Sequence, residues 1–505
     1  MEASPGSEPI LLKGQGITER IVYQHVTDRI MSEEQAIVFE WDGESPLTED
    51  TPRPIAGSNA IPDWFQKLPT HGESGGSTVK LCASFSDALR AGWIIPLPFD
   101  LSFVRGADSM SCVIPDSDAE ATVYGSSDAE SSKNSSFRKP ELKIPNPWKI
   151  HTPDGYSTLV TYPRNREDDG IKPYSMFVDT DSYDGRINIP VSTTQTRADI
   201  PAGVPFVQVI PLKRDAILSD FDVTDESESP GVHKLWHETH SRAMAEDGYY
   251  RRYCWEPKAA TTLEDYTGEE DFDSQHGSES VQSLTGSGKE QSAVPEPDHT
   301  PKLFISDELS GIVPNPFPMT EMVPKWITDP AELSVNGEDE EKFRTWAHDL
   351  LRLGWNVPIV SDTIVRVSGN DIDLHSEFQG TYKRGEWHDV GTESIHPSYQ
   401  VGEKYSSGRP GVAKVTSPWF TITPPEYSVL QCEPFNHRQQ YNSSYTGIVE
   451  TDRYVADANL LGKVDLPDGE YLLGKGEPAI SQVAFRRDAL LKTGYAVENG
   501  DVVEK

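Results

Sequence analysis

Residues 87–96 read Asp-Ala-Leu-Arg-Ala-Gly-Trp-Ile-Ile-Pro, and residues 349–358 read Asp-Leu-Leu-Arg-Leu-Gly-Trp-Asn-Val-Pro. Apolar residues at helical spacing precede the glycine in both stretches, and glycine is common just past the end of a helix. The residues after the glycine enter an extended run with rough alternation of apolar side chains. Each stretch therefore predicts a short helix, over 86–91 in the first and 342–353 in the second, that leads into a strand.

These two stretches belong to an ordered series of repeated segments. The early members share one constant spacing, the next members share a second, slightly larger one, and the last member follows after a further small shift. An ordered series at near-constant spacing is not expected by chance, so the sequence indicates an internal duplication. The remaining repeated segments are 61–64 and 323–326, 147–148 and 418–419, 156–159 and 427–430, 178–183 and 449–454, and 203–209 and 476–483.

Short apolar runs separated by turn residues follow in each repeat. In the first repeat they are residues 157–162, 175–178, 186–191 and 206–211. Such spacing is typical of antiparallel sandwiches and barrels. We therefore predict a mainly β protein with small helical elements (α+β), built as two tandem homologous modules of β-barrel or β-clip type.

The same pattern divides the chain into six parts. The stretch between the modules contains a Glu-, Asp-, Ser- and Gly-rich run with almost no apolar periodicity, which is typical of a flexible linker. The predicted parts are an N-terminal extension (1–60), the first module (61–217), a helical and aromatic segment (218–257), an acidic linker (258–310), the second module (311–495) and a C-terminal tail (496–505).

The charge balance is strongly acidic. Asp and Glu number 81 against 45 Lys and Arg, which gives a formal net charge of −36. A surface of this charge repels phosphate backbones, so the sequence argues against nucleic acid as a partner. Self-repulsion of this size destabilises a compact chain in ordinary salt, whereas in about 1 M salt the Debye length falls to about 3 Å. Because both repeats are acidic, this favours a haloadapted protein over a mesophilic one with an acidic linker.

The four cysteines, Cys82, Cys112, Cys254 and Cys432, are scattered and include no C-x-x-C pair. Their spacing predicts neither a disulfide framework nor a zinc site, so each is interpreted as a small buried apolar residue. The N-terminus has no basic and apolar leader pattern, and no apolar run is long enough to span a bilayer. We expect a soluble protein made in the cytoplasm, with no membrane insertion and no cofactor.

The candidate site residues are Asp179, Asp181 and Tyr183, since carboxylates and a tyrosine on a strand turn can hold a base or a metal. Together with Gly203 and Gln208 they resemble two motifs of the trimeric dUTPases. The resemblance implies that an aspartate activates water and that a tyrosine lies beneath the deoxyribose. The sequence departs from that pattern, because one extra residue lies between the aspartate and the tyrosine and the Gly-rich C-terminal lid is missing.

Further departures weaken a catalytic interpretation. The phosphate motif is only echoed by residues 163–166, and in the second repeat Glu450 and Ala456 stand where Asp179 and Gly185 stand in the first. We therefore expect these residues to shape a polar turn, with no catalytic, cofactor-binding or metal-binding residue assigned.

Three weaker patterns contain residues of functional type. His237 and Glu238 lie beside His233, His240 and Asp247, but they do not form H-E-x-x-H, so a solvated helix face is favoured. Residues 286–289, Gly-Ser-Gly-Lys, lack the first glycine of a phosphate-binding loop. The repeated tryptophans are interpreted as core residues, namely Trp64, Trp93, Trp148, Trp326, Trp355 and Trp419.

The motif order in residues 61–257 also resembles an uncharacterised protein family encoded by tailed phages, with the second repeat as a diverged match. The resemblance rests on residues 62–65, 92–100, 146–157, 178–183 and 203–211, and it ends with residues 250–255. With the acidic balance, it implies a virus of haloarchaea as the source.

Two function classes remain open from the sequence. The first is a structural virion protein, such as a capsid decoration or vertex turret component that forms a symmetric homo-oligomer and contacts other capsid proteins. The second is a dUTPase-like enzyme that hydrolyses nucleotides. A third and weaker alternative is a tail-associated protein that binds host surface glycans through exposed aromatic rings.

Overall fold

The computed structural model describes most of both repeats. It describes residues 10–13, 19–22, 37–42, 50–72, 75–106, 110–114, 121–123, 140–166, 169–193, 195–225, 227–228, 241–242, 249–256, 300–305, 309–329, 338–369, 371–376, 394–397, 411–437, 443–454, 457–463, 468–491 and 494–497. Below, the first half means the described residues between 37 and 225, and the second half those between 300 and 491. The predicted linker at 258–310 lies largely outside the described residues.

One antiparallel sheet in each half has the same strand order. In the first half the order is β13-β11-β16-β5-β4, and in the second it is β28-β26-β31-β21-β20. The strands of the first sheet are β4 (Ile55–Ala56), β5 (Trp93–Pro96), β11 (Tyr156–Thr161), β13 (Met176–Val178) and β16 (Pro205–Lys213). Those of the second are β20 (Phe317–Pro318), β21 (Trp355–Pro358), β26 (Tyr427–Cys432), β28 (Gly447–Val449) and β31 (Pro478–Arg486).

A three-stranded sheet in each half also has a matching partner. The first is β15 (Arg197–Ile200), β6 (Leu101–Arg105) and β7 (Met110–Val113), with β6 in the centre. The second is β30 (Gly469–Leu473), β22 (Thr363–Ser368) and β23 (Asp371–Ser376), with β22 in the centre. The registers also correspond, because Ile200 lies opposite Leu101 and Leu473 lies opposite Thr363.

Three further sheets complete the described strands. Two of them join segments far apart in the chain, since β32 lies between β2 and β3 and the strand β18 pairs in parallel with β19. The strands of all three sheets are β1 (Ile10–Lys13), β2 (Glu19–Val22), β3 (Ile37–Trp41), β8 (Thr122–Val123), β9 (Leu142–Ile144), β10 (Trp148–His151), β12 (Ile171–Pro173), β14 (Ile189–Thr193), β18 (Asp222–Asp225), β19 (Lys302–Ile305), β24 (Ser394–Pro397), β25 (Gly411–Ile422), β27 (Ser443–Ser444), β29 (Asp457–Lys463) and β32 (Gly494–Val497). The short strand β17 (Ile217–Leu218) pairs with β31.

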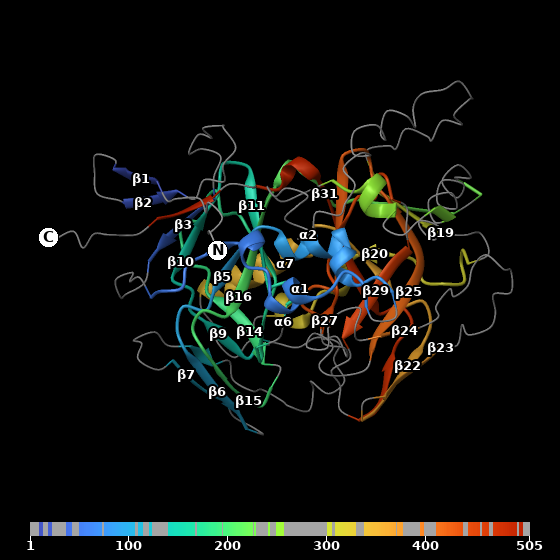
Figure 1. The fold of residues 1–505 in the computed structure, drawn as a ribbon, viewed down its shortest axis with the longest axis horizontal. Coiled ribbons are helices and arrows are strands. Elements are labelled where there is room, and N and C mark those ends of the chain that lie inside the picture. Colours follow the sequence, from blue (N-terminus) through green and yellow to red (C-terminus); the bar gives the residue numbers. More distant parts are fainter. Residues whose placement is uncertain are drawn as a thin grey trace.

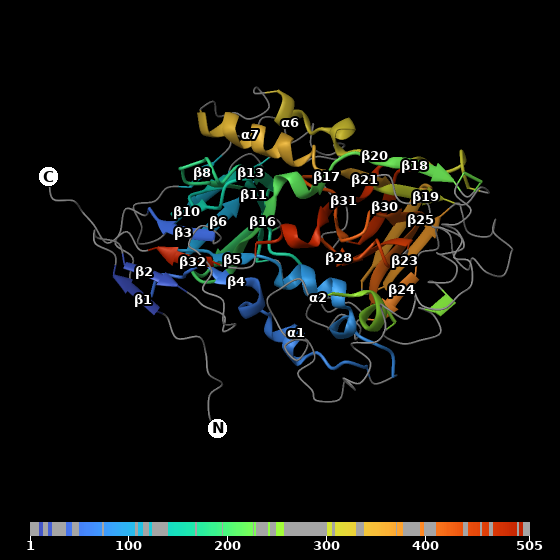
Figure 2. The same ribbon diagram turned by 90° about the horizontal axis from the view of Figure 1, so that it is seen from above.

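The predicted helices are present at both Gly-Trp stretches. They are α2 (Ala83–Arg90) and α7 (Glu338–Leu350), and each is preceded by a shorter helix, α1 (Asp63–Lys67) or α6 (Lys325–Thr328). Gly92 follows α2 with a φ of 62°, a backbone conformation that favours glycine. Figure 2 shows α6 and α7 on one face of the sheets, and α1 and α2 on the opposite face.

Each long helix packs on the half to which it does not belong. Helix α2 contacts β28 of the second half, and α7 contacts β13 of the first. In Figure 1 the two halves lie side by side, the first in blue to green and the second in yellow to red. The largest apolar core continues through this joint, for it includes Met176 and Leu212 together with Phe343 and Phe485.

The mainly β prediction is confirmed, but the barrel is not. Every sheet formed by the described strands keeps two open edges, so none closes on itself. The physical reason is that the edge strands β13 and β28 are covered by helices from the other half, which protects them without further strand pairing. The interpretation of the repeated tryptophans as core residues is confirmed for five of the six, while Trp64 is half-buried.

Candidate functional site

The predicted site residues lie together on the turn that follows β13. The Asp181 carboxylate accepts a hydrogen bond from the Gly155 N–H at 2.9 Å and pairs with the guanidinium of Arg214, just past β16. The Ser157 hydroxyl donates to Asp179 at 2.5 Å. The two aspartates therefore tie the turn to β11, the neighbour of β13 in the sheet, and to the end of β16, the next strand along.

Tyr183, the third predicted residue, is engaged by both its ring and its hydroxyl. The hydroxyl donates to the carbonyl oxygen of Arg186 at 3.2 Å. The ring packs edge-on against Trp346 of α7, with centroids 4.9 Å apart. A contact of this kind stabilises packing between the halves.

The electrostatics of Asp181 do not suit a general base. The hydrogen bond from Arg214 lowers the pKa of the Asp181 carboxyl below its ordinary value of 3.8, and the Gly155 N–H adds to this effect. A general base works best with a pKa near the operating pH. Asp181 is instead an acceptor that is ionised at neutral pH and holds the turn.

The equivalent turn in the second half is held by an aspartate in a similar way. Asp452 accepts from the Glu426 N–H at 2.8 Å and from both terminal nitrogens of Arg487 at 2.9 Å. Glu426 has a φ of 72° where Gly155 has 84°. Two threonine hydroxyls also contact each other in both turns, at 2.7 and 2.8 Å. The shared Thr-Asp motif therefore stabilises a backbone turn in both halves.

We expect Asp181→Asn to destabilise the protein by about 1–3 kcal/mol at pH 7, because it removes the charged partner of Arg214. Asp452→Asn should have a loss of similar size. A folded-state pKa below 3.8 makes this contribution present above that pH and lost as the pH falls through the folded value. Urea unfolding of the variants and the wild type at pH 7 and pH 3 measures both effects. Asp154→Asn, at an exposed residue next to Gly155, is the control, and equal stability of all three variants would contradict the prediction.

Glu450 stands where Asp179 stands in the first half, but its surroundings differ. Its side chain is 0% exposed. One carboxyl oxygen accepts from the Glu256 N–H at 3.0 Å, and the other contacts the hydroxyl of Tyr250. Burial and, to a smaller extent, the nearby Asp87 raise the pKa of Glu450 to about 9. Sequence reasoning did not select Glu450, because Val-Glu-Thr-Asp has the same local pattern as the exposed turn of the first half.

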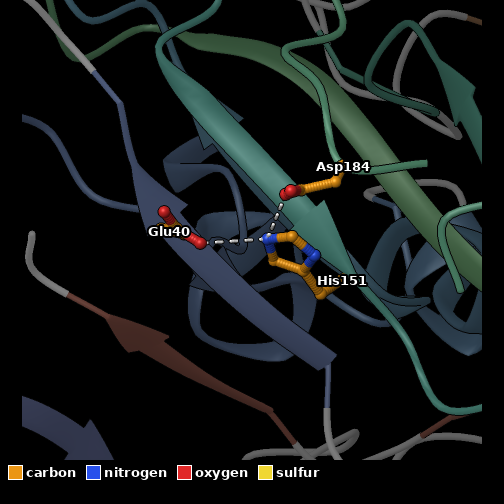
Figure 3. A group of neighbouring side chains, drawn as sticks. All are labelled: Glu40, His151 and Asp184. Atoms are coloured by element: carbon orange, nitrogen blue, oxygen red, sulfur yellow. Dashed lines mark hydrogen bonds and ion pairs between the residues drawn. The ribbon is translucent and has the colours of Figure 1, made fainter. Parts of the chain in front are cut away.

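A second cluster joins Glu40 of β3, His151 of β10 and Asp184 (Figure 3). The Nε2 atom of His151 lies 3.2 Å from Glu40 Oε2 and 4.0 Å from Asp184 Oδ1. Histidine and carboxylates are ligands for zinc and other divalent metals. These residues were not predicted, because only the pairing of β3 with β10 brings residue 40 beside residue 151.

The charges around this cluster are those of an ion-pair network. The Lys149 ammonium lies 3.7 Å from Glu40 and 3.8 Å from Asp184 and from Asp42. Arg186 lies 3.7 Å from Asp42 as well. A divalent cation would have to displace Lys149 from the two carboxylates it already neutralises, so the donor set does not fit a preformed metal centre.

The remaining sequence candidates have mixed outcomes. His233, His237, Glu238, His240, Asp247 and the Gly-Ser-Gly-Lys run lie outside the described residues. The four cysteines are free thiols, and Cys254 and Cys432 are buried as expected. The expectation is wrong for Cys82, which is exposed because it lies at the surface where α2 begins, and Cys112 is only partly buried.

Comparisons of the chain with protein-family models, with curated proteins and with solved structures find no match. Among the described helices, none has the length and apolar character needed to cross a membrane.

Proposed function

We propose that this chain is a structural protein built as a covalent pseudo-dimer, in which two copies of one module face each other across an internal two-fold axis. The contact that carries the proposal joins Asn165 to Thr446. The Asn165 amide donates to the Thr446 carbonyl at 2.8 Å and accepts from the Thr446 N–H at 2.8 Å. The Asn436 amide makes the same two bonds with Ser175, at 2.9 and 2.8 Å.

These two contacts are related by the repeat. The spacing that relates 156–159 to 427–430 also places Asn436 at the position of Asn165, and Thr446 at the position of Ser175. Both asparagines have a positive φ, 55° and 60°. When residue i of one copy contacts j of the other, and j of the first contacts i of the second, the interface is isologous, as in a two-fold dimer.

Strand contacts near the ends of β16 and β31 are reciprocal in the same way. Ile217 pairs with Phe485, and Leu212 bridges to Leu490. Each repeat has an Arg-Asp-Ala turn here, at 214–216 and 487–489. Aligning these turns makes Phe485 the equivalent of Leu212 and Leu490 the equivalent of Ile217. With the reciprocal packing of α2 and α7, these contacts support a duplicated module whose joint corresponds to a dimer interface.

The joint and the turns also favour an architectural role over a catalytic one. The carboxylates of the predicted site hold turns in both halves, and the tyrosine packs between the halves. Small symmetric modules often assemble around further symmetry axes. With the resemblance to a tailed-phage family and the net charge of −36, this supports a virion protein of a haloarchaeal virus, as a capsid decoration or vertex turret component that binds its own copies and other capsid proteins.

Quantitative mass spectrometry of purified virus particles kept in high salt tests this proposal. We expect the chain at tens of copies per particle, at a constant ratio to the major capsid protein. Detection only in infected cells, with none in particles, would overturn the virion role.

A nucleotide-hydrolysing enzyme is the second candidate, because Asp179 remains exposed and available to a ligand, with 63% of its side chain accessible. We expect no dUTP hydrolysis above that of a matched Asp179→Asn variant in molar salt. Hydrolysis by the wild type that this substitution abolishes would favour the enzyme. The glycan-binding alternative needs exposed aromatic rings, and the repeated tryptophans do not supply them because they are buried or half-buried.

A further inference from the structure

The two helix–strand contacts across the joint are completed by different residues. On α7, Trp346 packs against Tyr183 of the other half, with ring centroids 4.9 Å apart. When the two Gly-Trp stretches are aligned, the equivalent residue of α2 is Ser84, which is too small to fill the same space. There Tyr250 supplies the ring, and it packs against Tyr454 at 4.8 Å. Tyr250 belongs to neither sheet nor to either long helix.

We propose that residues 250–256 form a clasp that locks the two halves together through the buried carboxyl group of Glu450, and that ionisation of this group releases the clasp. The clasp consists of the π-helical turn η6 (Tyr250–Cys254) followed by Trp255 and Glu256. This inference rests on the two-half joint proposed above. The clasp would make the stability of that joint depend on pH.

The clasp binds one buried acid from each half. The indole N–H of Trp255 donates to Asp87 of α2 at 2.7 Å. The N–H of Glu256 donates to Glu450 of the second half at 3.0 Å. The Tyr250 hydroxyl accepts from the Glu450 N–H at 3.2 Å, contacts the Glu450 carboxyl group and lies 3.5 Å from the Ile448 carbonyl. A protonated Glu450 can therefore donate to the Tyr250 oxygen while the tyrosine donates to Ile448, and ionisation removes the first of these bonds. The clasp is therefore a bridge between α2 and the turn after β28.

The charges at this bridge make it sensitive to one proton. Asp87 is 1% exposed and Glu450 is 0% exposed, and the nearby Asp87 adds to the cost of ionising Glu450. Arg251 of the clasp is buried, with its guanidinium 5.8 Å from the centre of the Trp255 ring. The charged groups that the structure describes near the Glu450 turn include Arg487, Asp452, Arg453 and the Glu256 carboxylate. Arg487 pairs with Asp452 at 2.9 Å and with Glu256 at 3.2 Å, while Arg453 lies 2.5 Å from Glu256. Both cations thus already have anionic partners other than Glu450.

The direction of the pH effect follows from the raised pKa. Glu450 keeps its proton in the clasped state up to about pH 9, whereas a free glutamate loses it near pH 4.5. The clasped state therefore binds one proton more than the open state between these values. Its stability is full below pH 4.5 and falls as the pH rises towards 9.

Cys254 gives a direct readout, because its thiol is buried in the clasp and lies 3.6 Å from the Arg453 carbonyl. The full-length protein in molar salt would be treated briefly with iodoacetamide from pH 7 to pH 10, and labelling of each cysteine measured by mass spectrometry. The exposed Cys82 corrects for the intrinsic rise in thiol reactivity. We expect the ratio of Cys254 to Cys82 labelling to rise at least tenfold in the wild type and to stay flat in Glu450→Gln.

Two controls keep the outcome decisive. Asp179→Asn changes the equivalent turn of the first half and should behave as the wild type. Trp255→Phe removes the indole donor and should raise Cys254 labelling already at pH 7. Labelling of the buried Cys432 reports opening of the whole joint. A flat wild-type ratio, an equal rise in Glu450→Gln, or a parallel rise at Cys432 would each overturn the clasp, and none of them bears on whether the chain is in virus particles.

Discussion

Replacing Gly354 by alanine is expected to destabilise the protein by about 3–5 kcal/mol, enough to abolish folding in a marginally stable domain. A Cβ atom at Gly354 would lie 2.0 Å from the carbonyl oxygen of Gln482, and one at Gly92 would lie 2.0 Å from that of Val209. Both oxygens belong to a central strand of their sheet, which cannot move without breaking its ladder. Gly92→Ala carries the added cost of a positive φ.

Gly203→Ala is the matched control for these variants. Its φ is 89°, and no atom lies within 4 Å of the Cβ it would gain. It should therefore lose only about 1 kcal/mol from backbone strain. Soluble yield and denaturant unfolding in molar salt measure the difference. If Gly354→Ala loses no more stability than Gly203→Ala, the close approach of helix end and strand is not as tight as described.

Transfer from about 3 M to about 0.1 M KCl is expected to unfold the wild-type protein. The formal net charge is −36 at pH 7, and the Debye length grows from under about 3 Å to about 10 Å over this range, so repulsion between surface carboxylates is no longer screened. We expect the midpoint of thermal unfolding to fall by tens of degrees. Circular dichroism at a series of salt concentrations and constant pH measures it.

Two comparisons separate screening from other effects of salt. Sucrose strengthens burial without screening charge, so it should not replace KCl. Lowering the pH towards the sequence pI of about 4.7 should restore part of the lost stability at low salt, because the net charge falls. An unfolding midpoint that does not depend on KCl would contradict the haloadapted interpretation.

Local pattern predicted some elements of the fold. The helices before Gly92 and Gly354 are present, as are strands at most of the predicted apolar runs. What the pattern did not predict is the partner of each helix. Apolar periodicity identifies the buried face of α2, but it does not say that this face packs on β28, in the distant second half of the chain. The barrel prediction was wrong for the same reason.

The site was predictable only where it is local. Asp179, Asp181 and Tyr183 share one turn, so sequence proximity was enough to group them. Arg214 reaches Asp181 because β11 and β16 pair in one register, and the sequence alone does not fix that register. The burial of Glu450 depends on the distant segment that contains Tyr250, and no local feature of its own turn indicates that contact.

The contrast between Ser84 and Trp346 has a consequence for how such a chain evolves. In an assembly of two identical subunits, every substitution appears twice, at both ends of the interface. In this chain the two positions are encoded separately, so a large ring can be gained at one end while the other end recruits Tyr250 from elsewhere. Selection can therefore keep a fixed ring contact at the Trp346 end of the joint and change the contact at the Tyr250 end independently.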